Sequence, residues 1–157
     1  MDSNPLESPK NRPPRILGLD FGNRRIGVSV SDELGLTAHP VLTLVRKNLR
    51  QDLRSLARLA RKYECAEIVM GEPLYPSGDP SPQGARVRDF AGQLEAETGM
   101  PVYLWDERLS TAEAHRYLDE TGRRPKERKA VIDQLAAVLI LQSFLDARRV
   151  PERPPSG

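Results

Sequence analysis

Short apolar runs alternate with amphipathic stretches along most of this chain, and few folds accommodate that order. Apolar residues predict strands at 15–20 and 26–30, joined by a tight turn, and a third strand at 39–45. Two more strands, at 66–71 and 102–105, each follow a helical pattern. Hairpins give antiparallel strands, whereas strand–helix–strand units give right-handed parallel crossovers. We therefore expect an α/β fold with a mixed sheet of about five strands, the first three antiparallel, flanked by helices.

Four helical segments are predicted around these strands. Capping boxes begin two of them, at Asn48 and at Ser110. Another covers 84–98, and the last follows the basic turn 123–129 and runs to about 147. On the first helix four arginines share one face, which is typical of a solvated surface; they are Arg50, Arg54, Arg58 and Arg61.

The chain has 157 residues, which suits a single domain. Residues 1–14 and 150–157 are polar and rich in proline, so we expect two disordered tails around a core domain at 15–149. The longest apolar run, 135–141, is too short to cross a bilayer, and the N-terminus has no apolar signal core. Cys65 is the only cysteine and cannot form an internal disulfide. These features predict a cytoplasmic protein with no membrane partner.

Two acidic residues stand directly at the ends of predicted strands. Asp20 ends the first strand between Gly18 and Gly22, whose small size leaves room for a metal or a phosphate. An aspartate that starts a turn has the same pattern. Glu107 follows the strand at 102–105, and ligands bind at the carboxyl ends of parallel strands. An acid that favours the dipole of the next helix would also stand there.

The third acid, Asp133, lies on a helix that is apolar nearly all round. Between Ala130 and Leu145 only four residues are polar. Such a helix is buried, and a buried carboxylate needs a partner, which is either the helix N-terminus or a metal ion. If Asp20, Glu107 and Asp133 converge, their oxygens suit Mg²⁺ or Mn²⁺. Two such ions would serve phosphodiester hydrolysis, with Asp20 bridging them and each other acid holding one.

The net charge is only +2, but basic residues gather near these acids. A phosphodiester enzyme needs both, because it must hold a polyanion beside a negatively charged metal site. The stretch 123–129 leads straight to Asp133, so phosphate contacts there would position a substrate at the metals. The candidate nucleic-acid-binding residues are Arg24, Arg25, Arg123, Arg124, Lys126, Arg128 and Lys129.

Three long motifs and a looser fourth follow one another along the core; they are 19–32, 106–114, 132–141 and, more loosely, 69–74 with Gly78. Together they resemble the YqgF/RuvX family over residues 15–147. The resemblance implies an RNase H-like fold and a metal-dependent nuclease. It also implies that the acidic site positions of the family are Asp20, Glu107 and Asp133, and it makes Arg108 a candidate phosphate contact.

One residue departs from the family pattern. The family usually has an apolar residue between the glycine and the proline of Gly71–Glu72–Pro73, at the end of the fourth strand. Resolvases related to this family place a catalytic acid near that strand end. Glu72 is therefore either an additional metal ligand or a solvated surface residue, and we favour the second alternative because exposed glutamates are common.

The resemblance implies that this chain is a hydrolase, a metal-dependent nuclease that processes the 5′ end of pre-16S rRNA in ribosome biogenesis. The alternative is a Holliday junction resolvase acting on branched DNA in recombination and repair, which needs two active sites and hence a homodimer. An alternative of another class is a nucleic-acid-binding module for ribosome assembly with little catalysis. The segment Asp20–Gly22 also resembles the phosphate loop of sugar kinases, but those enzymes need two domains and this chain has room for one.

Overall fold

The computed structural model describes residues 14–108 and 125–149, with side chains in the second stretch described for 134–148. Its elements in chain order are β1 (Arg15–Phe21), β2 (Arg25–Ser31), β3 (Ala38–Val45), α1 (Leu49–Lys62), β4 (Cys65–Glu72), α2 (Pro82–Thr98), β5 (Val102–Asp106) and α4 (Pro125–Arg149). The helix predicted at Ser110 and nearly all of both predicted tails lie outside the described residues. No helix in the described ranges has the apolar length that a lipid bilayer requires.

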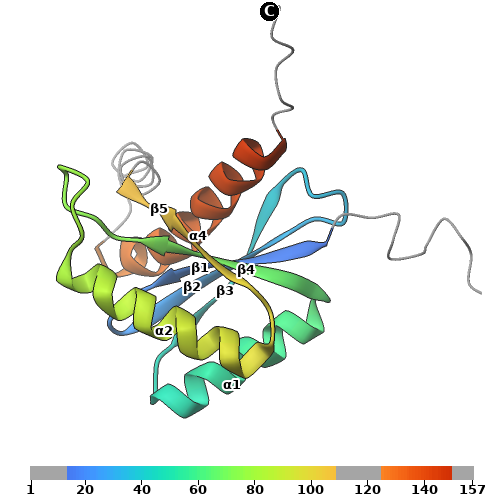
Figure 1. The fold of residues 1–157 in the computed structure, drawn as a ribbon, viewed down its shortest axis with the longest axis horizontal. Coiled ribbons are helices and arrows are strands. Elements are labelled where there is room, and N and C mark those ends of the chain that lie inside the picture. The colour runs from blue at the N-terminus through green and yellow to red at the C-terminus, as the bar shows by residue number, and fades with distance from the viewer. Residues whose placement is uncertain (1–13, 109–124, 150–157) are drawn as a thin grey trace, which may run out of the picture.

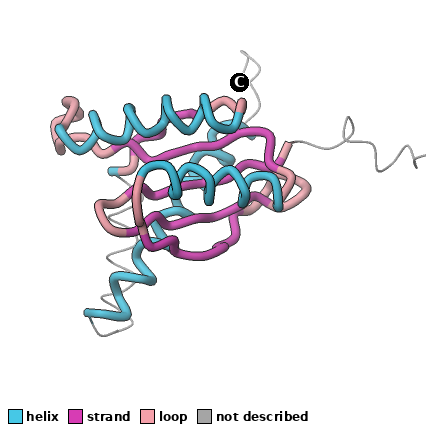
Figure 2. The backbone as a smooth tube through the Cα atoms, turned by 90° about the horizontal axis from the view of Figure 1, so that it is seen from below, coloured by secondary structure: helices cyan, strands magenta, loops and turns pink. Residues whose placement is uncertain are grey.

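The five strands form one mixed sheet in the order β3-β2-β1-β4-β5. β1 pairs antiparallel with β2, and β2 with β3, whereas β1 pairs parallel with β4, and β4 with β5. Helices α1 and α2 lie side by side on one face of the sheet, and α4 crosses the other face (Figure 1, Figure 2). This arrangement confirms the predicted mixed sheet with its first three strands antiparallel.

The last helix begins earlier than the sequence suggested. The basic turn predicted at 123–129 is wrong from Pro125 onward, because α4 already starts at that residue. Proline is favoured at the first position of a helix, since its fixed φ suits the helix and its missing N–H would have no helical partner there. Lys126, Arg128 and Lys129 therefore belong to the first turns of α4 rather than to a loop.

Alternation along β1 divides its side chains between the two faces of the sheet. Leu19 and Phe21 belong to the core under α1 and α2, whereas Ile16 belongs to the core under α4. Gly18 and Asp20 share the face of Ile16, because residues two apart on a strand point the same way. Asp20 therefore lies on the α4 face of the sheet, near the carboxyl end of β1.

Small residues let α4 lie close on its face of the sheet. A Cβ atom on Gly18 would lie 2.4 Å from the Ser29 hydroxyl and 2.7 Å from the Cβ of Leu141. The buried Ser29 hydroxyl donates a hydrogen bond to the Ala137 carbonyl at 2.8 Å. Any larger residue in place of Gly18 would push α4 away from β1, the strand that carries Asp20.

Replacing Gly18 by Ala is expected to lower the free energy of unfolding by about 1–3 kcal/mol, because the added methyl group overpacks the contact between β1 and α4. Urea denaturation measures this loss. Gly92→Ala in α2 is the matched control, since a Cβ there meets nothing within 4 Å. An alanine in a helix interior should instead raise the stability by about 0.5–1 kcal/mol. Equal effects in both variants would refute close docking of α4 at Gly18.

Candidate active site

Asp20 and Glu107 stand at the same edge of the sheet. The register of β1 and β4 places Asp20 beside Gly71. Gly71 pairs with Trp105 of β5, two residues before Glu107, so Glu107 shares the face of Trp105. Trp105 packs against the core under α4, and Glu107 therefore also lies on the α4 face. The two acids flank the end of β4 from its two sides, at the carboxyl edge where parallel sheets bind ligands.

Gly71 makes room for the Glu107 carboxylate. A Cβ atom on Gly71 would lie 2.6 Å from Oε2 of Glu107 and 2.5 Å from Cδ1 of Ile140 on α4. No real side chain tolerates both contacts without moving one of these groups. The carboxylate thus lies over the bare backbone of β4 and against α4, and the glycine is the residue that permits this position.

Helix α4 crosses the sheet in a direction that places its first turns near the same edge. Arg148, near the end of α4, pairs with Glu67 near the start of β4, at 2.6 Å between Nη1 and Oε1. Ile140 lies instead over Gly71, near the end of β4. The helix therefore runs from the carboxyl edge toward the amino edge. Asp133 lies seven residues before Ile140 along α4, two turns closer to the carboxyl edge.

Glu107 is a partly buried carboxyl group with an unusual protonation equilibrium. Burial, followed by the negative charge of the adjacent Asp106, raises its pKa from 4.5 to about 7. A group in this state pays a desolvation cost when ionised, and a nearby cation would remove that cost. A bound metal ion would therefore stabilise the ionised form of Glu107.

The residues at this edge fit a divalent cation. Asp20 and Glu107 supply carboxylate oxygens, the ligands that Mg²⁺ and Mn²⁺ prefer. Among the side chains that the structure describes, no group of three or more His, Cys, Asp and Glu is close enough to hold a metal. The side chain of Asp133, the third acid of the expected set, lies outside the described residues.

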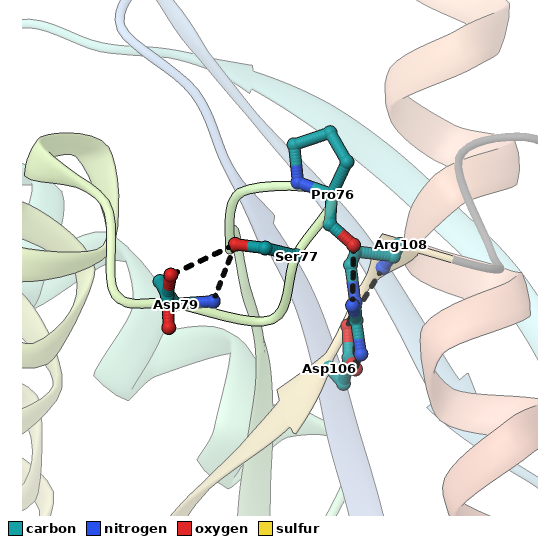
Figure 3. A network of polar contacts seen from close by, with 5 residues as sticks. All are labelled: Pro76, Ser77, Asp79, Asp106 and Arg108. Atoms are coloured by element: carbon teal, nitrogen blue, oxygen red, sulfur yellow. Dashed lines mark hydrogen bonds and ion pairs between the residues drawn. The ribbon is translucent and has the colours of Figure 1, made fainter.

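Arg108 is occupied by protein groups rather than directed freely at solvent. Its guanidinium donates to both oxygens of Asp106, at 2.6–3.0 Å, and its Nη1 donates to the Pro76 carbonyl at 3.0 Å (Figure 3). The hydrogen bonds from Arg108 lower the pKa of Asp106. Arg108 therefore ties the end of β5 to the loop between β4 and α2 and holds Asp106 in an ion pair beside Glu107.

Glu72 lies on the opposite side of the sheet from these acids. It follows Gly71 directly, and strand alternation turns it toward α2, where its Oε2 accepts a hydrogen bond from Nη1 of Arg88 at 2.8 Å. The structure thus does not bring Glu72 together with Asp20 and Glu107. The sequence predicts this position of Glu72, because neighbouring residues of a strand point to opposite faces of the sheet and Glu72 directly follows Gly71.

The predicted basic residues that the structure describes lie around the same edge of the sheet. Arg24 lies exposed in the turn between β1 and β2, and Arg25 starts β2. Lys126, Arg128 and Lys129 lie in the first turns of α4, and Arg123 and Arg124 are outside the described residues. Sequence reasoning missed Arg46, whose guanidinium lies 4.4 Å from the ring centre of Phe21. No local sequence pattern predicts that contact, because Arg46 is far from β1 along the chain.

Comparison with known proteins identifies a matching family and several similar proteins. The sequence model of a family described as "RuvX: Holliday junction resolvase" matches residues 14–147. A protein of Syntrophus aciditrophicus, named as a candidate pre-16S rRNA nuclease, is 50% identical over 133 residues, which cover 85% of this chain and 89% of that protein. A protein of the same name from Koribacter versatilis is 48% identical, with 90% of this chain and 92% of the relative covered.

Solved structures with the same fold are more distant in sequence. The RuvC protein of T. thermophilus in complex with a Holliday junction substrate has a TM-score of 0.55 at 16% identity, covering 87% of this chain and 96% of that one. The fowlpox virus resolvase in complex with Holliday junction DNA has a TM-score of 0.54 at 11% identity, covering 86% and 99%. These similarities confirm the predicted RNase H-like fold.

Proposed function

This chain belongs to the RuvX family of nucleases, and on that premise we propose that Asp20, Glu107 and Asp133 hold the divalent metal ions of its active site. The observation that carries the proposal is the placement of the Glu107 carboxylate over Gly71, beside Asp20 and below α4. Acids from two strands and one helix then surround the carboxyl edge of the sheet. Glu72 is not included, because it pairs with Arg88 on the other face.

The residues of the site would act as follows. Mg²⁺ or Mn²⁺ bound here would supply a Lewis acid for the phosphodiester and lower the pKa of a water molecule. Asp20, at the end of the central strand β1, would hold both ions together with the other two acids. Glu107 loses its proton near neutral pH, which makes its oxygens available as ligands. Arg108 keeps Asp106 in an ion pair and so leaves Glu107 as the ligand from β5.

The proposed substrate is structured RNA, specifically the 5′ end of pre-16S rRNA during ribosome biogenesis in the cytoplasm. Its support is the name of the relatives that are 50% and 48% identical to this chain. The description of the matching family favours a second candidate, cleavage of branched DNA, for which two copies of the chain would have to present two sites. The structures bound to Holliday junctions are at most 16% identical, so we rank RNA first.

Removal of the metal tests the reaction and the choice of substrate together. The protein would be incubated with a pre-16S rRNA fragment and with four-way-junction DNA, in Mg²⁺ or Mn²⁺ and in EDTA. In Mg²⁺ or Mn²⁺ we expect cleavage of the RNA and slower cleavage of the junction. EDTA should stop the cleavage, because loss of the ions removes several kcal/mol of charge stabilisation. Cleavage that persists in EDTA would refute the metal site. Paired symmetric cuts in the junction alone would favour the resolvase, and binding without cleavage would favour an assembly module.

A further inference from the structure

A groove runs between the end of β3 and helix α1. It has a volume of about 260 Å³. The residues that matter for its chemistry are Leu44, Val45, Lys47, Asp52, Arg54 and Arg58. Two of the four α1 arginines that the sequence predicts to form a solvated face thus line a concave surface, while Arg50 and Arg61 lie outside it.

The cations of this groove have no ion-pair partner among the residues that the structure describes. Lys47, Arg54 and Arg58 are exposed, and their side chains form no ion pair within residues 14–108 and 134–148. The acid in the groove, Asp52, is only 2% exposed. It accepts hydrogen bonds from Nε of Arg46 at 3.2 Å and from the backbone N–H of Lys47 at 3.0 Å. Three cations therefore face solvent without a carboxylate to balance them.

Arg46 ties this groove to the strand that carries Asp20. Besides its ion pair with Asp52, it donates from Nη1 to the carbonyl of Gly22 at 3.2 Å. Its backbone N–H donates to the carbonyl of Arg24 at 2.9 Å, and its guanidinium stacks on Phe21. β3 ends at the same edge where β1 ends, because Val45 pairs with Arg25 at the start of β2. The groove therefore reaches the edge of the sheet that carries the candidate metal site, on the α1 face, whereas Asp20 lies on the α4 face of that edge.

The spacing of these features fits a polymer of phosphates. β3 lies two strands from β1, so the ends of these strands are about 10 Å apart within the sheet. The groove lies on the α1 face and Asp20 on the α4 face, so a nucleic-acid strand that passes around this edge, past the turn with the exposed Arg24, needs at least about three nucleotides to reach from one to the other. Arg54 and Arg58 stand one helical turn apart, about 6 Å along α1. The apolar Leu44 and Val45 flank these cations, which suits sugars between phosphates better than it suits an isolated phosphate ion.

We infer that this β3–α1 groove binds the phosphodiester backbone of the substrate strand on one side of the bond to be cleaved. The inference rests on the proposed function for the position of that bond, but the groove itself requires only a nucleic-acid strand. Lys47, Arg54 and Arg58 contact successive phosphates, and Arg46 is a positioning residue that holds the groove at the turn after Asp20. The exposed Arg24 lies in the turn between β1 and β2, which the strand passes on its way from the groove to the metal site.

Two double variants of α1 provide the test. Arg54→Gln with Arg58→Gln removes two charges from the groove, and Arg50→Gln with Arg61→Gln removes two charges from the same helix outside it. Gln is a good helix former, so both variants should fold, and thermal melting checks this. Binding of a fluorescein-labelled single-stranded RNA, and of DNA with the same sequence, is measured by fluorescence anisotropy in EDTA across a range of salt concentrations.

The groove variant is expected to bind both probes more weakly by roughly tenfold or more near physiological salt, and its salt slope should fall by about one to two. The control variant should keep the slope of the wild type. Equal losses in both variants would overturn the inference, because only net charge would then matter. Because binding is measured without metal, a protein that binds through the groove but cleaves nothing supports the inference while refuting the proposed function. An unchanged slope in a protein that cleaves refutes the groove alone.

Discussion

Asp20→Asn is expected to reduce metal-dependent cleavage by about 10²–10³-fold while leaving nucleic-acid binding close to that of the wild type. The amide keeps the size of the side chain but removes the negative charge that the metal ions require. A loss of several kcal/mol of transition-state stabilisation corresponds to this change in rate. Asp20 ends the central strand β1 and is proposed to hold both ions, so its loss should affect both. Single-turnover cleavage and anisotropy in EDTA measure the two quantities separately.

The matched control is Glu72→Gln. It makes the same carboxylate-to-amide change at the end of the neighbouring strand β4, but on the face that pairs with Arg88. We expect cleavage within a few-fold of the wild type, since an exposed ion pair contributes little to stability and lies away from the metals. A large loss of activity in Glu72→Gln would instead identify Glu72 as a ligand. Full activity in Asp20→Asn would place the reaction elsewhere.

Glu107→Gln is expected to abolish cleavage and, at the same time, to stabilise the metal-free protein at pH 8. The ionised Glu107 is held in a desolvated position over Gly71, and a neutral amide of the same shape avoids that cost. Burial raises the pKa of Glu107 from 4.5 to about 7, which sets the cost of ionising it in the native state at up to about 3 kcal/mol. An active site that lowers the stability of the protein until its cation binds is a common trade-off between stability and activity.

The sign of this effect can be checked by its pH dependence. Because the folded-state pKa of Glu107 is higher than the unfolded-state value, the native protein binds the extra proton, and the wild type loses stability as pH rises from about 4.5 to 7. The difference between the variant and the wild type should therefore be small at pH 4.5 and largest above pH 7. Urea denaturation in EDTA at both pH values measures it. A variant less stable than the wild type at pH 8 would show that Glu107 is already paired with a cationic group of the protein.

Added metal gives a second readout of the same site. Mg²⁺ should stabilise the wild type at pH 8, because a ligand that binds only the folded state shifts the unfolding equilibrium. Glu107→Gln and Asp20→Asn should gain much less from it. Equal stabilisation of all three proteins would mean that the ion binds away from these acids.

The sequence predicted much of the edge that carries the site. Short apolar runs located β1 and β5, and the rule that ligands bind at the carboxyl ends of parallel strands brought Asp20 and Glu107 to one edge. The same alternation assigns Glu72 to the other face, which the sequence analysis did not use. These relations are predictable because they depend on residues one or two positions apart.

Partners far apart in the chain were not predictable in the same way. Arg108 looked like a phosphate contact because it follows Glu107, but the Pro76 carbonyl, 32 residues away, accepts one of its hydrogen bonds. Arg46 reaches the Gly22 carbonyl, 24 residues away, and so connects α1 with the end of β1. Arg54 and Arg58 differ from Arg50 and Arg61 only by which neighbouring element lies against them. Helical periodicity describes all four arginines equally.

The sequence by itself determined the order and type of the strands, the mixed sheet, and the acids that end its strands, because hydrophobic periodicity and turn chemistry are local properties. Only the tertiary structure decided how closely those acids are held. The packing of α4 on Gly18 and Gly71 sets the position and the raised pKa of Glu107, and the packing of α1 beside β3 turns two surface arginines into a groove. Desolvation and charge pairing depend on distances between segments that meet only after folding.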